Sequence, residues 1–222
     1  MLSRIVLLAT GMLIATGVLA QDNPRLSPGL VCHAQTTLMR KLALQSDFDI
    51  PPAINALIVN VIDGKLPLVR QQLNNMNKAE ATRWRQSALI IAVYAKRPAV
   101  VAALLEDGAA VNGKGEMPDL KCSFRNQAIA DVKKDPVSPP NLRPGSTEDF
   151  EEGAVLWFNG GLDGPALSTA IECSDAATVG VVLRRHPDVM LRPAPDVVDP
   201  LQSAIVQGNA VIVKQHLDHG AT

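Results

Sequence analysis

The sequence predicts an all-α protein built from helical hairpins stacked side by side. Aromatic residues make up only 3% of the chain, and alanine, valine and leucine dominate its apolar residues, a composition that suits closely packed helices better than a β-sandwich. Apolar pairs recur at helical spacing after each of four leucines. Glycines recur where the helices of these segments should end. Together these features indicate a solenoid whose hairpins pack on their neighbours.

Residues 1–20, MLSRIVLLATGMLIATGVLA, have the layout of a secretory signal peptide. A single cation, Arg4, precedes an apolar run, and Val18 and Ala20 occupy the minus-three and minus-one places before Gln21. The apolar run is short for a bilayer span of roughly 20 residues, and no basic cluster follows it. We expect cleavage after Ala20, a periplasmic or secreted protein, and no membrane attachment of the mature chain.

The charges of the chain are nearly balanced, with 21 Lys and Arg against 22 Asp and Glu. A balanced, mixed charge pattern lacks the basic footprint that nucleic acids and anionic lipids require. We therefore expect neither as a partner. Residues 21–222 are enough for one domain with a sizeable core.

Residues 21–50 form the first segment of the mature chain. They begin with the polar, proline-bearing run QDNPRLSPG, and a helical stretch follows at 36–45 with Leu38, Leu42 and Leu44 on it. Because each end of a solenoid exposes an apolar face, the segment is predicted to be an N-terminal helical cap.

The clearest hairpin lies in the stretch SALIIAVYAKRPAVVAALLEDGAAVN, residues 87–112. Leu89 and Ala92 share one face of a first helix. Pro98 begins a second helix, where its missing N–H costs nothing, and Gly108 ends it.

The same spacing recurs from four anchor leucines, Leu57, Leu89, Leu167 and Leu201. They are separated by 32, 78 and 34 residues, and two of these distances fall near a period of about 33. Residues 51–113 are thus predicted to hold the first two units and residues 164–222 the last two. Other solenoids of antiparallel helix pairs are the alternative.

Two segments carry a resemblance to ankyrin repeats. Pro200-Leu201 with Ala204 and Gly208 resembles the opening of that repeat, and LLEDGA at 104–109 resembles its close. The resemblance covers the four units and implies an ankyrin-like solenoid that binds other proteins. Certain positions depart from the family pattern: Lys96 and Ser174 replace the inner glycine, His186 replaces the closing glycine of the third unit, and Asn209 stands where many members have histidine.

The distance of 78 residues between the second and third anchors predicts a long insertion at residues 114–163. It contains the turn-rich run DPVSPPNLRPG, which cannot continue a helix. Insertions in repeat proteins usually emerge on one face, often the binding one. At the far end, the outward face of the last unit should be polar, with Lys214, Gln215 and Asp218 on it.

The chain has three cysteines, Cys32, Cys122 and Cys173. In an oxidising compartment two of them can pair, and the sequence leaves all three pairings open. We favour Cys122 with Cys173, because that bridge would tie down the insertion; three inert thiols are the alternative. No CxxC or zinc-like spacing is present.

Catalytic and metal-binding patterns are weak. His216 and His219 stand three residues apart, but His216 takes a place that is leucine or valine in two other units, so we expect it to be packed rather than to bind a metal. No GxSxG motif and no phosphate-binding glycine loop occurs. We therefore predict no enzyme activity, no metal and no cofactor.

Exposed aromatic and arginine side chains are the best candidates for contact with a partner, because these residues dominate binding hot spots. In the ankyrin arrangement, residues 83–85 would lie in the projecting finger loop, so Trp84 is predicted to be exposed, and Tyr94 would face the neighbouring groove or pack between units. For Trp157 and Phe158, the alternative is a small core formed by the insertion itself. The predicted contact residues are Arg83, Trp84, Arg85, Tyr94, Trp157 and Phe158.

These features predict an exported, periplasmic ankyrin-like module that binds a protein partner without catalysis. Exported bacterial relatives of this kind include immunity proteins against periplasm-targeted toxins and proteins that support envelope enzymes under stress, so the resemblance implies these two finer roles. An envelope enzyme with catalytic residues in the insertion is the remote alternative.

Overall fold

The computed structural model describes residues 28–46, 50–116, 164–190 and 199–221. Within these ranges the chain is helical and contains no strand. The signal-like residues 1–20 and nearly all of the predicted insertion, including Cys122, Trp157 and Phe158, lie outside the described ranges.

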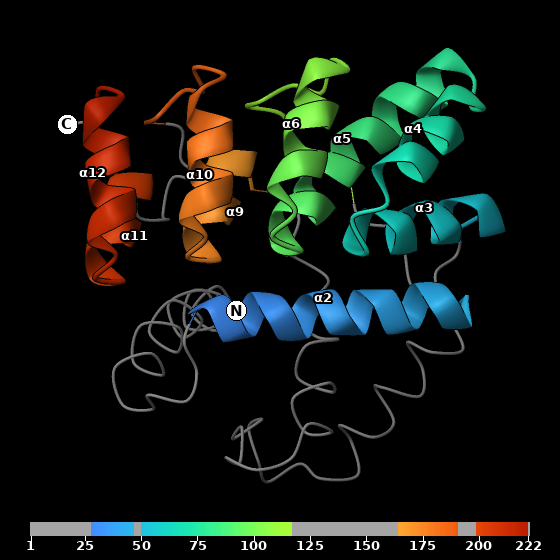
Figure 1. Cartoon of the computed structure of the whole chain (residues 1–222), viewed down its shortest axis with the longest axis horizontal. Coiled ribbons are helices and arrows are strands. Elements are labelled where there is room, and N and C mark those ends of the chain that lie inside the picture. Colours follow the sequence, from blue (N-terminus) through green and yellow to red (C-terminus); the bar gives the residue numbers. More distant parts are fainter. Residues whose placement is uncertain (1–27, 47–49, 117–163, 191–198, 222) are drawn as a thin grey trace, which may run out of the picture.

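Eight of the helices form four hairpins that stand side by side in chain order (Figure 1). The first helices of the hairpins are α3 (Pro52–Ile62), α5 (Lys78–Tyr94), α9 (Ala166–Glu172) and α11 (Pro200–Val206). The second helices are α4 (Leu66–Asn74), α6 (Pro98–Glu106), α10 (Ala176–Leu183) and α12 (Ala210–Asp218). The predicted solenoid of helical hairpins is therefore confirmed.

The second and third hairpins pack directly on each other even though residues 107–165 separate them in the chain. Helix α5 contacts α9, and α6 contacts α10, just as α9 contacts α11 and α10 contacts α12 in the uninterrupted pair. All four anchor leucines, Leu57, Leu89, Leu167 and Leu201, are buried on the first helix of their hairpin. The stack of hairpins is therefore continuous between the second and third hairpins.

A left-handed residue stands seven positions after each anchor leucine, in the turn between the two helices of the hairpin. The φ angles are 75° at Gly64, 53° at Lys96, 54° at Ser174 and 68° at Gly208. In each turn the next residue donates its N–H to a carbonyl five residues back, for example Arg97 to Ala92 at 2.9 Å. This is the Schellman closure of a helix. The turn persists in all four hairpins, including the two that have lost the glycine.

Side-chain caps explain several helix starts. Asn77 accepts a hydrogen bond from the N–H of Glu80 and so begins α5, and Asp199 caps α11 in the same way through Gln202. Asn209 caps α12, and its amide also donates to the Ser174 hydroxyl at 3.0 Å. These caps satisfy N–H groups that have no partner within the helix.

Helix α5 is longer than the other first helices, and this corrects the predicted finger loop. It runs without a break from Lys78 to Tyr94, so residues 83–85 are helical. Ala81, Trp84 and Ala88 recur on one face of the helix and are all buried, with Trp84 only 6% exposed. The prediction that Trp84 is exposed was wrong, because helical periodicity outweighs its two charged neighbours.

Helix α2 (Pro28–Gln45) runs along the row of hairpins, crosswise to the axes of the hairpin helices (Figure 1). It packs on the first helices α3, α5 and α9 and buries Leu38, Met39 and Leu42 against them. The segment predicted to cap one end of the solenoid therefore spans three hairpins.

A disulfide joins Cys32 of α2 to Cys173 at the end of α9, with 5.5 Å between the Cα atoms. This corrects the favoured pairing of Cys122 with Cys173. The bridge arises because α2 reaches α9 across 141 residues of sequence, a proximity that only the tertiary packing creates. Both cysteines are buried. The bridge thus ties α2 to the third hairpin.

The last hairpin exposes an apolar face, contrary to the prediction of a polar one. Ile205 and Leu217 are exposed, whereas the residues at the same places in the two preceding hairpins are buried under the next unit: Val93, Ile171, Leu105 and Leu183. Of the residues predicted to face outward, Lys214 and Asp218 are exposed and form an ion pair at 2.7 Å. Gln215 instead packs near Gly180 of the third hairpin. None of the described helices is long and apolar enough to cross a membrane.

His216 is buried in this last hairpin, as its leucine-like position predicted. Neither ring nitrogen has a hydrogen-bond partner among the described residues. Burial lowers the pKa of His216; the charge of Asp199 opposes this shift and that of His219 adds to it. The neutral imidazole is therefore the form that the fold favours.

Loss of the Cys32–Cys173 bridge should destabilise the protein strongly. The bridge closes a loop of 141 residues, and the chain-entropy model assigns such a loop about 5 kcal/mol of unfolding free energy. Replacing both cysteines with serine should lower the denaturation midpoint, measured by circular dichroism in urea. Titration of the unreduced, denatured protein should find one free thiol, and the substitution Cys122→Ser should abolish it. Retention of that thiol in the variant would contradict the pairing.

His216 should make the protein acid-sensitive. As the pH falls below about 6.5, the unfolded chain takes up a proton on this histidine before the folded chain does, so the unfolding free energy should fall. His216→Leu should remove this pH dependence. It should also raise the unfolding free energy at neutral pH by about 1–3 kcal/mol, because it eliminates two unsatisfied buried nitrogens. Urea unfolding from pH 7.5 to 5 measures both effects. An unchanged pH slope in the variant would assign the sensitivity to another group.

Candidate functional site

The structure does not bring the four described contact residues predicted from the sequence into one surface. Arg83 is exposed on α5, Trp84 is buried beneath it and Arg85 is half-buried. The Arg83 guanidinium lies 5.5 Å from the Trp84 ring centroid. Tyr94 is buried at the other end of α5, three turns away.

The chain's own loop after the second hairpin covers this part of α5. Gln86 exchanges two hydrogen bonds with the backbone of Ala110, at 2.9 and 3.1 Å, and the N–H of Glu116 donates to the Ser87 hydroxyl. The Glu116 carboxylate pairs with Arg83. The predicted surface around Arg83 is therefore largely engaged in contacts within the molecule.

A second surface combines an open shape with two cations, Lys96 and Arg97, that form no ion pair with a described residue. It is a groove of about 870 Å³ between α2 and the turns that end α3 and α5, and we call it the α2 groove. Helix α2 contributes His33, Arg40, Lys41 and Leu44 to one side. The two turns contribute Ile62, Asp63, Tyr94, Lys96 and Arg97 to the other. Of the four predicted contact residues that the structure describes, only Tyr94 lines it.

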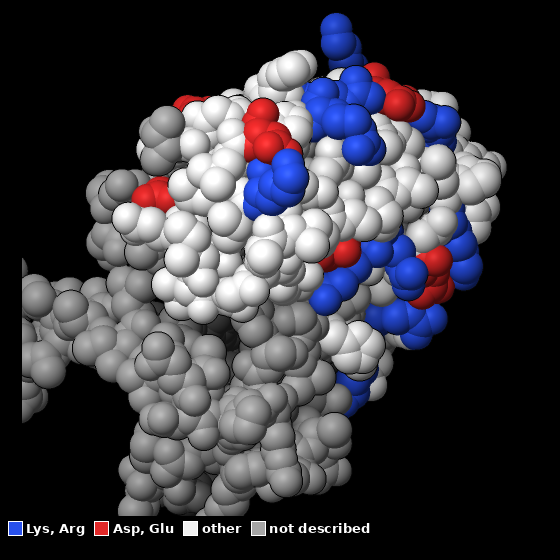
Figure 2. Space-filling model, turned by 60° about the vertical axis from the view of Figure 1, so that its left-hand side comes forward, with Lys and Arg blue, Asp and Glu red and all other residues white. Residues whose placement is uncertain are grey.

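The α2 groove is cationic. Among the described residues, four lysine and arginine side chains line it against a single carboxylate, that of Asp63. In Figure 2, lysine and arginine side chains gather in the right-hand half of the described surface, and only a few charged groups lie towards its centre and left. The nearly neutral chain thus concentrates positive charge locally.

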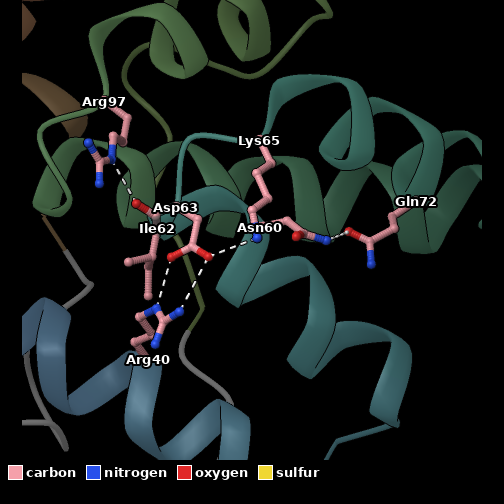
Figure 3. Close-up of polar contacts among 7 residues, drawn as sticks. All are labelled: Arg40, Asn60, Ile62, Asp63, Lys65, Gln72 and Arg97. Atoms are coloured by element: carbon pink, nitrogen blue, oxygen red, sulfur yellow. Dashed lines mark hydrogen bonds and ion pairs between the residues drawn. The ribbon is translucent and has the colours of Figure 1, made fainter.

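Asp63 is held by two cations (Figure 3). The Arg40 guanidinium donates to both of its carboxylate oxygens, at 2.8 and 3.4 Å, and the Lys65 ammonium lies 3.1 Å from Oδ2. The hydrogen bond from Arg40, supported by Lys65 and opposed by partial burial, lowers the pKa of Asp63 to about 2. The carboxylate is therefore ionised and already compensated, and it also fastens α2 to the first hairpin.

Arg97 joins the second hairpin to the first. Its Nε donates to the carbonyl of Ile62 at 2.7 Å and so satisfies one of the last carbonyls of α3 (Figure 3). Its side chain crosses Gly64, where an added Cβ would lie 3.4 Å from Arg97 Cδ. The bond to the Ile62 carbonyl is the only hydrogen bond of the Arg97 side chain within the described part of the chain. Its Nη groups remain available to solvent or a ligand.

Lys96 is the unusual residue of the groove. It has a φ of 53° at a place where the first and last hairpins have glycine. A left-handed conformation costs an L-residue with a side chain about 1–2 kcal/mol. Its ammonium forms no hydrogen bond or ion pair with any described residue, so no polar contact of the charge offsets this strain. Strain that folding does not explain is typical of functional positions.

Sequence reasoning missed the α2 groove because α2 was assigned to the end of the row. The available signal was the loss of glycine at position 96, which the comparison with the ankyrin pattern noted but did not connect with binding. No group of three or more His, Cys, Asp or Glu side chains within the described ranges is arranged to hold a metal ion.

No family model and no curated protein matches the chain. Among solved structures, the ankyrin repeat domain of Bcl-3, a member of the IkappaB protein family, is similar over 75% of this chain and 72% of that one, with 21% identity and a TM-score of 0.34.

The fold is an ankyrin-like solenoid of helical hairpins. This assignment rests on the chain's own geometry: four stacked hairpins and a left-handed turn at the same place in each of them. The ankyrin hairpins of this chain differ from regular repeats in the crossing helix α2 and in the non-glycine residues at two of the inner turns.

Replacing Lys96 with glycine should not destabilise the protein. Relief of the left-handed strain outweighs or balances the extra unfolded-state entropy of glycine, about 0.5–1 kcal/mol, so the unfolding free energy should stay constant or rise by up to about 1 kcal/mol. His186→Gly is the matched control, because exposed His186 has a φ of 50° far along the row. Urea denaturation measures both variants. A clear loss in Lys96→Gly alone would show that Lys96 makes a stabilising contact.

Proposed function

We propose that this chain is an exported ankyrin-repeat protein that binds another protein and catalyses no reaction on it. The observation that carries the proposal is the α2 groove, which is open to solvent. Its two sides, α2 and the turns after α3 and α5, are fixed in position relative to each other. A repeat solenoid supplies such a surface without a loop that must first become ordered.

Two sets of contacts hold α2 in place against the hairpins. The Cys32–Cys173 bridge and the buried leucines of α2 hold this helix against three hairpins. The Arg40–Asp63 pair connects its exposed side to the first inner turn. Because these contacts exist before a partner arrives, binding does not have to pay for ordering the groove.

Export is supported by two independent features. Residues 1–20 have the layout of a cleavable signal peptide. The described cysteines pair in a buried disulfide, which is typical of proteins that mature in an oxidising compartment. We propose the periplasm as the site of action.

Two finer roles share this binding activity and differ in the partner. An immunity protein would hold one toxin, and a support protein would hold an enzyme of the envelope. Identification of the bound protein therefore assigns the role.

The mature protein should bind one envelope protein saturably. The bait is the processed chain, which should begin at Gln21 by intact-mass measurement, and an enriched protein should be purified and titrated against it by calorimetry. Arg40→Glu combined with Arg97→Glu should weaken binding at least tenfold, because two groove cations are reversed. Arg184→Glu combined with Lys214→Glu is the control, since both side chains are exposed on the later hairpins. Absence of any saturable partner would refute the proposed function.

A further inference from the structure

We propose that the α2 groove binds an acidic segment of the partner protein. The inference rests on the proposed protein-binding function and adds to it a surface and a partner chemistry. The surface is not the finger-loop side of the row but the opposite side, where the inner turns meet α2 (Figure 1).

The first argument is charge. Arg40, Lys41, Lys96 and Arg97 line the groove, and Asp63, the one carboxylate among its described lining residues, is already compensated by Arg40 and Lys65. An incoming carboxylate therefore meets positive charge with little opposing charge. A concave surface lined by one sign of charge concentrates ligands of the opposite sign and accelerates their association.

The second argument is the state of the donors. The Nη groups of Arg97 have no hydrogen-bond partner among the described residues, and the Lys96 ammonium has none either. A guanidinium presents two parallel N–H groups that match a carboxylate, and an adjacent ammonium adds a second point of attachment. Lys96 and Arg97 are consecutive, so their charges enter the groove from the same turn.

The third argument is that Lys96 keeps its charge in a strained conformation. The equivalent turns use Gly64, Ser174 and Gly208, so the hairpin itself does not require lysine. No described residue forms a hydrogen bond or an ion pair with the ammonium. The charge of Lys96 is therefore best explained by a ligand.

The fourth argument distinguishes a polypeptide from other polyanions. Leu44 on α2 is 58% exposed beside the cations, and buried Ile62 and Tyr94 also line the groove. This combination suits a chain with apolar side chains among its acidic ones. Nucleic-acid sites usually add exposed phenylalanine, tyrosine or tryptophan rings on which bases stack, and Tyr94, the one such residue among the described lining residues, is buried.

The test uses the oxidised mature protein and synthetic peptides. Helix α2 has 18 residues and is about 27 Å long, which an extended peptide of about eight residues would span. The probe alternates Glu or Asp with Leu or Val, and its partner peptide carries Gln and Asn instead. Fluorescence anisotropy should show binding of the acidic peptide at least tenfold tighter than that of the neutral one, weakening as salt is raised.

Variants locate the binding. Lys96→Gly and Arg97→Gln should each lower the affinity for the acidic peptide about three- to tenfold, and the double variant should lower it further. Losses of this size are expected when close charge pairs are removed. His186→Gly relieves the same kind of backbone strain outside the groove and should leave the affinity unchanged. Because Lys96→Gly is not expected to destabilise the fold, a loss of affinity in it cannot be attributed to unfolding.

Several results would overturn the inference. These are equal binding of acidic and neutral peptides, full affinity in the Lys96→Gly/Arg97→Gln double variant, or tighter binding to phosphatidylglycerol vesicles or to a single-stranded oligonucleotide than to the acidic peptide. If an envelope partner binds saturably while the double variant retains it, the inference fails and the proposed function stands. If no envelope partner binds either, the proposed function fails as well.

Discussion

Burial of small apolar side chains between neighbouring hairpins is the constraint on which the rest of the structure depends. Each first helix places its anchor leucine in the same buried row. Each inner turn has a residue in the left-handed conformation at the same position and closes with the same backbone hydrogen bond. Identical turns give hairpins of the same shape, and hairpins of the same shape stack. The second and third hairpins therefore meet as closely as the others although a long stretch of chain leaves the row between them.

Helix α2 converts this row into a surface with a groove. The helix packs across three hairpins, and the Cys32–Cys173 bridge and the Arg40–Asp63 pair hold it at two points. The inner turns of the first two hairpins then face α2 instead of open solvent. A residue such as Lys96, which would otherwise sit on an ordinary convex edge, becomes part of a concave, positively charged site.

Sequence patterns succeeded where the physical cause is local. The positions of Pro98, Gly108 and the anchor leucines follow from helix periodicity and from the stereochemistry of helix ends, so they could be predicted. Trp84 was misjudged because α5 begins earlier than the other first helices, and two flanking charges were given more weight than the helical face shared with Ala81 and Ala88. The apolar outward face of the last hairpin was also missed, because Ile205 and Leu217 repeat the residue types that neighbouring units bury.

The sequence by itself determined the repeated hairpins, their order and the turns between their helices, because each of these depends on residues within about 20 positions of one another. Only the tertiary structure decided the partner of Cys173 and the existence of the α2 groove. Both depend on where α2 lies against residues far away in the chain, and that position is chosen by the total apolar surface it buries across three hairpins rather than by any local pattern.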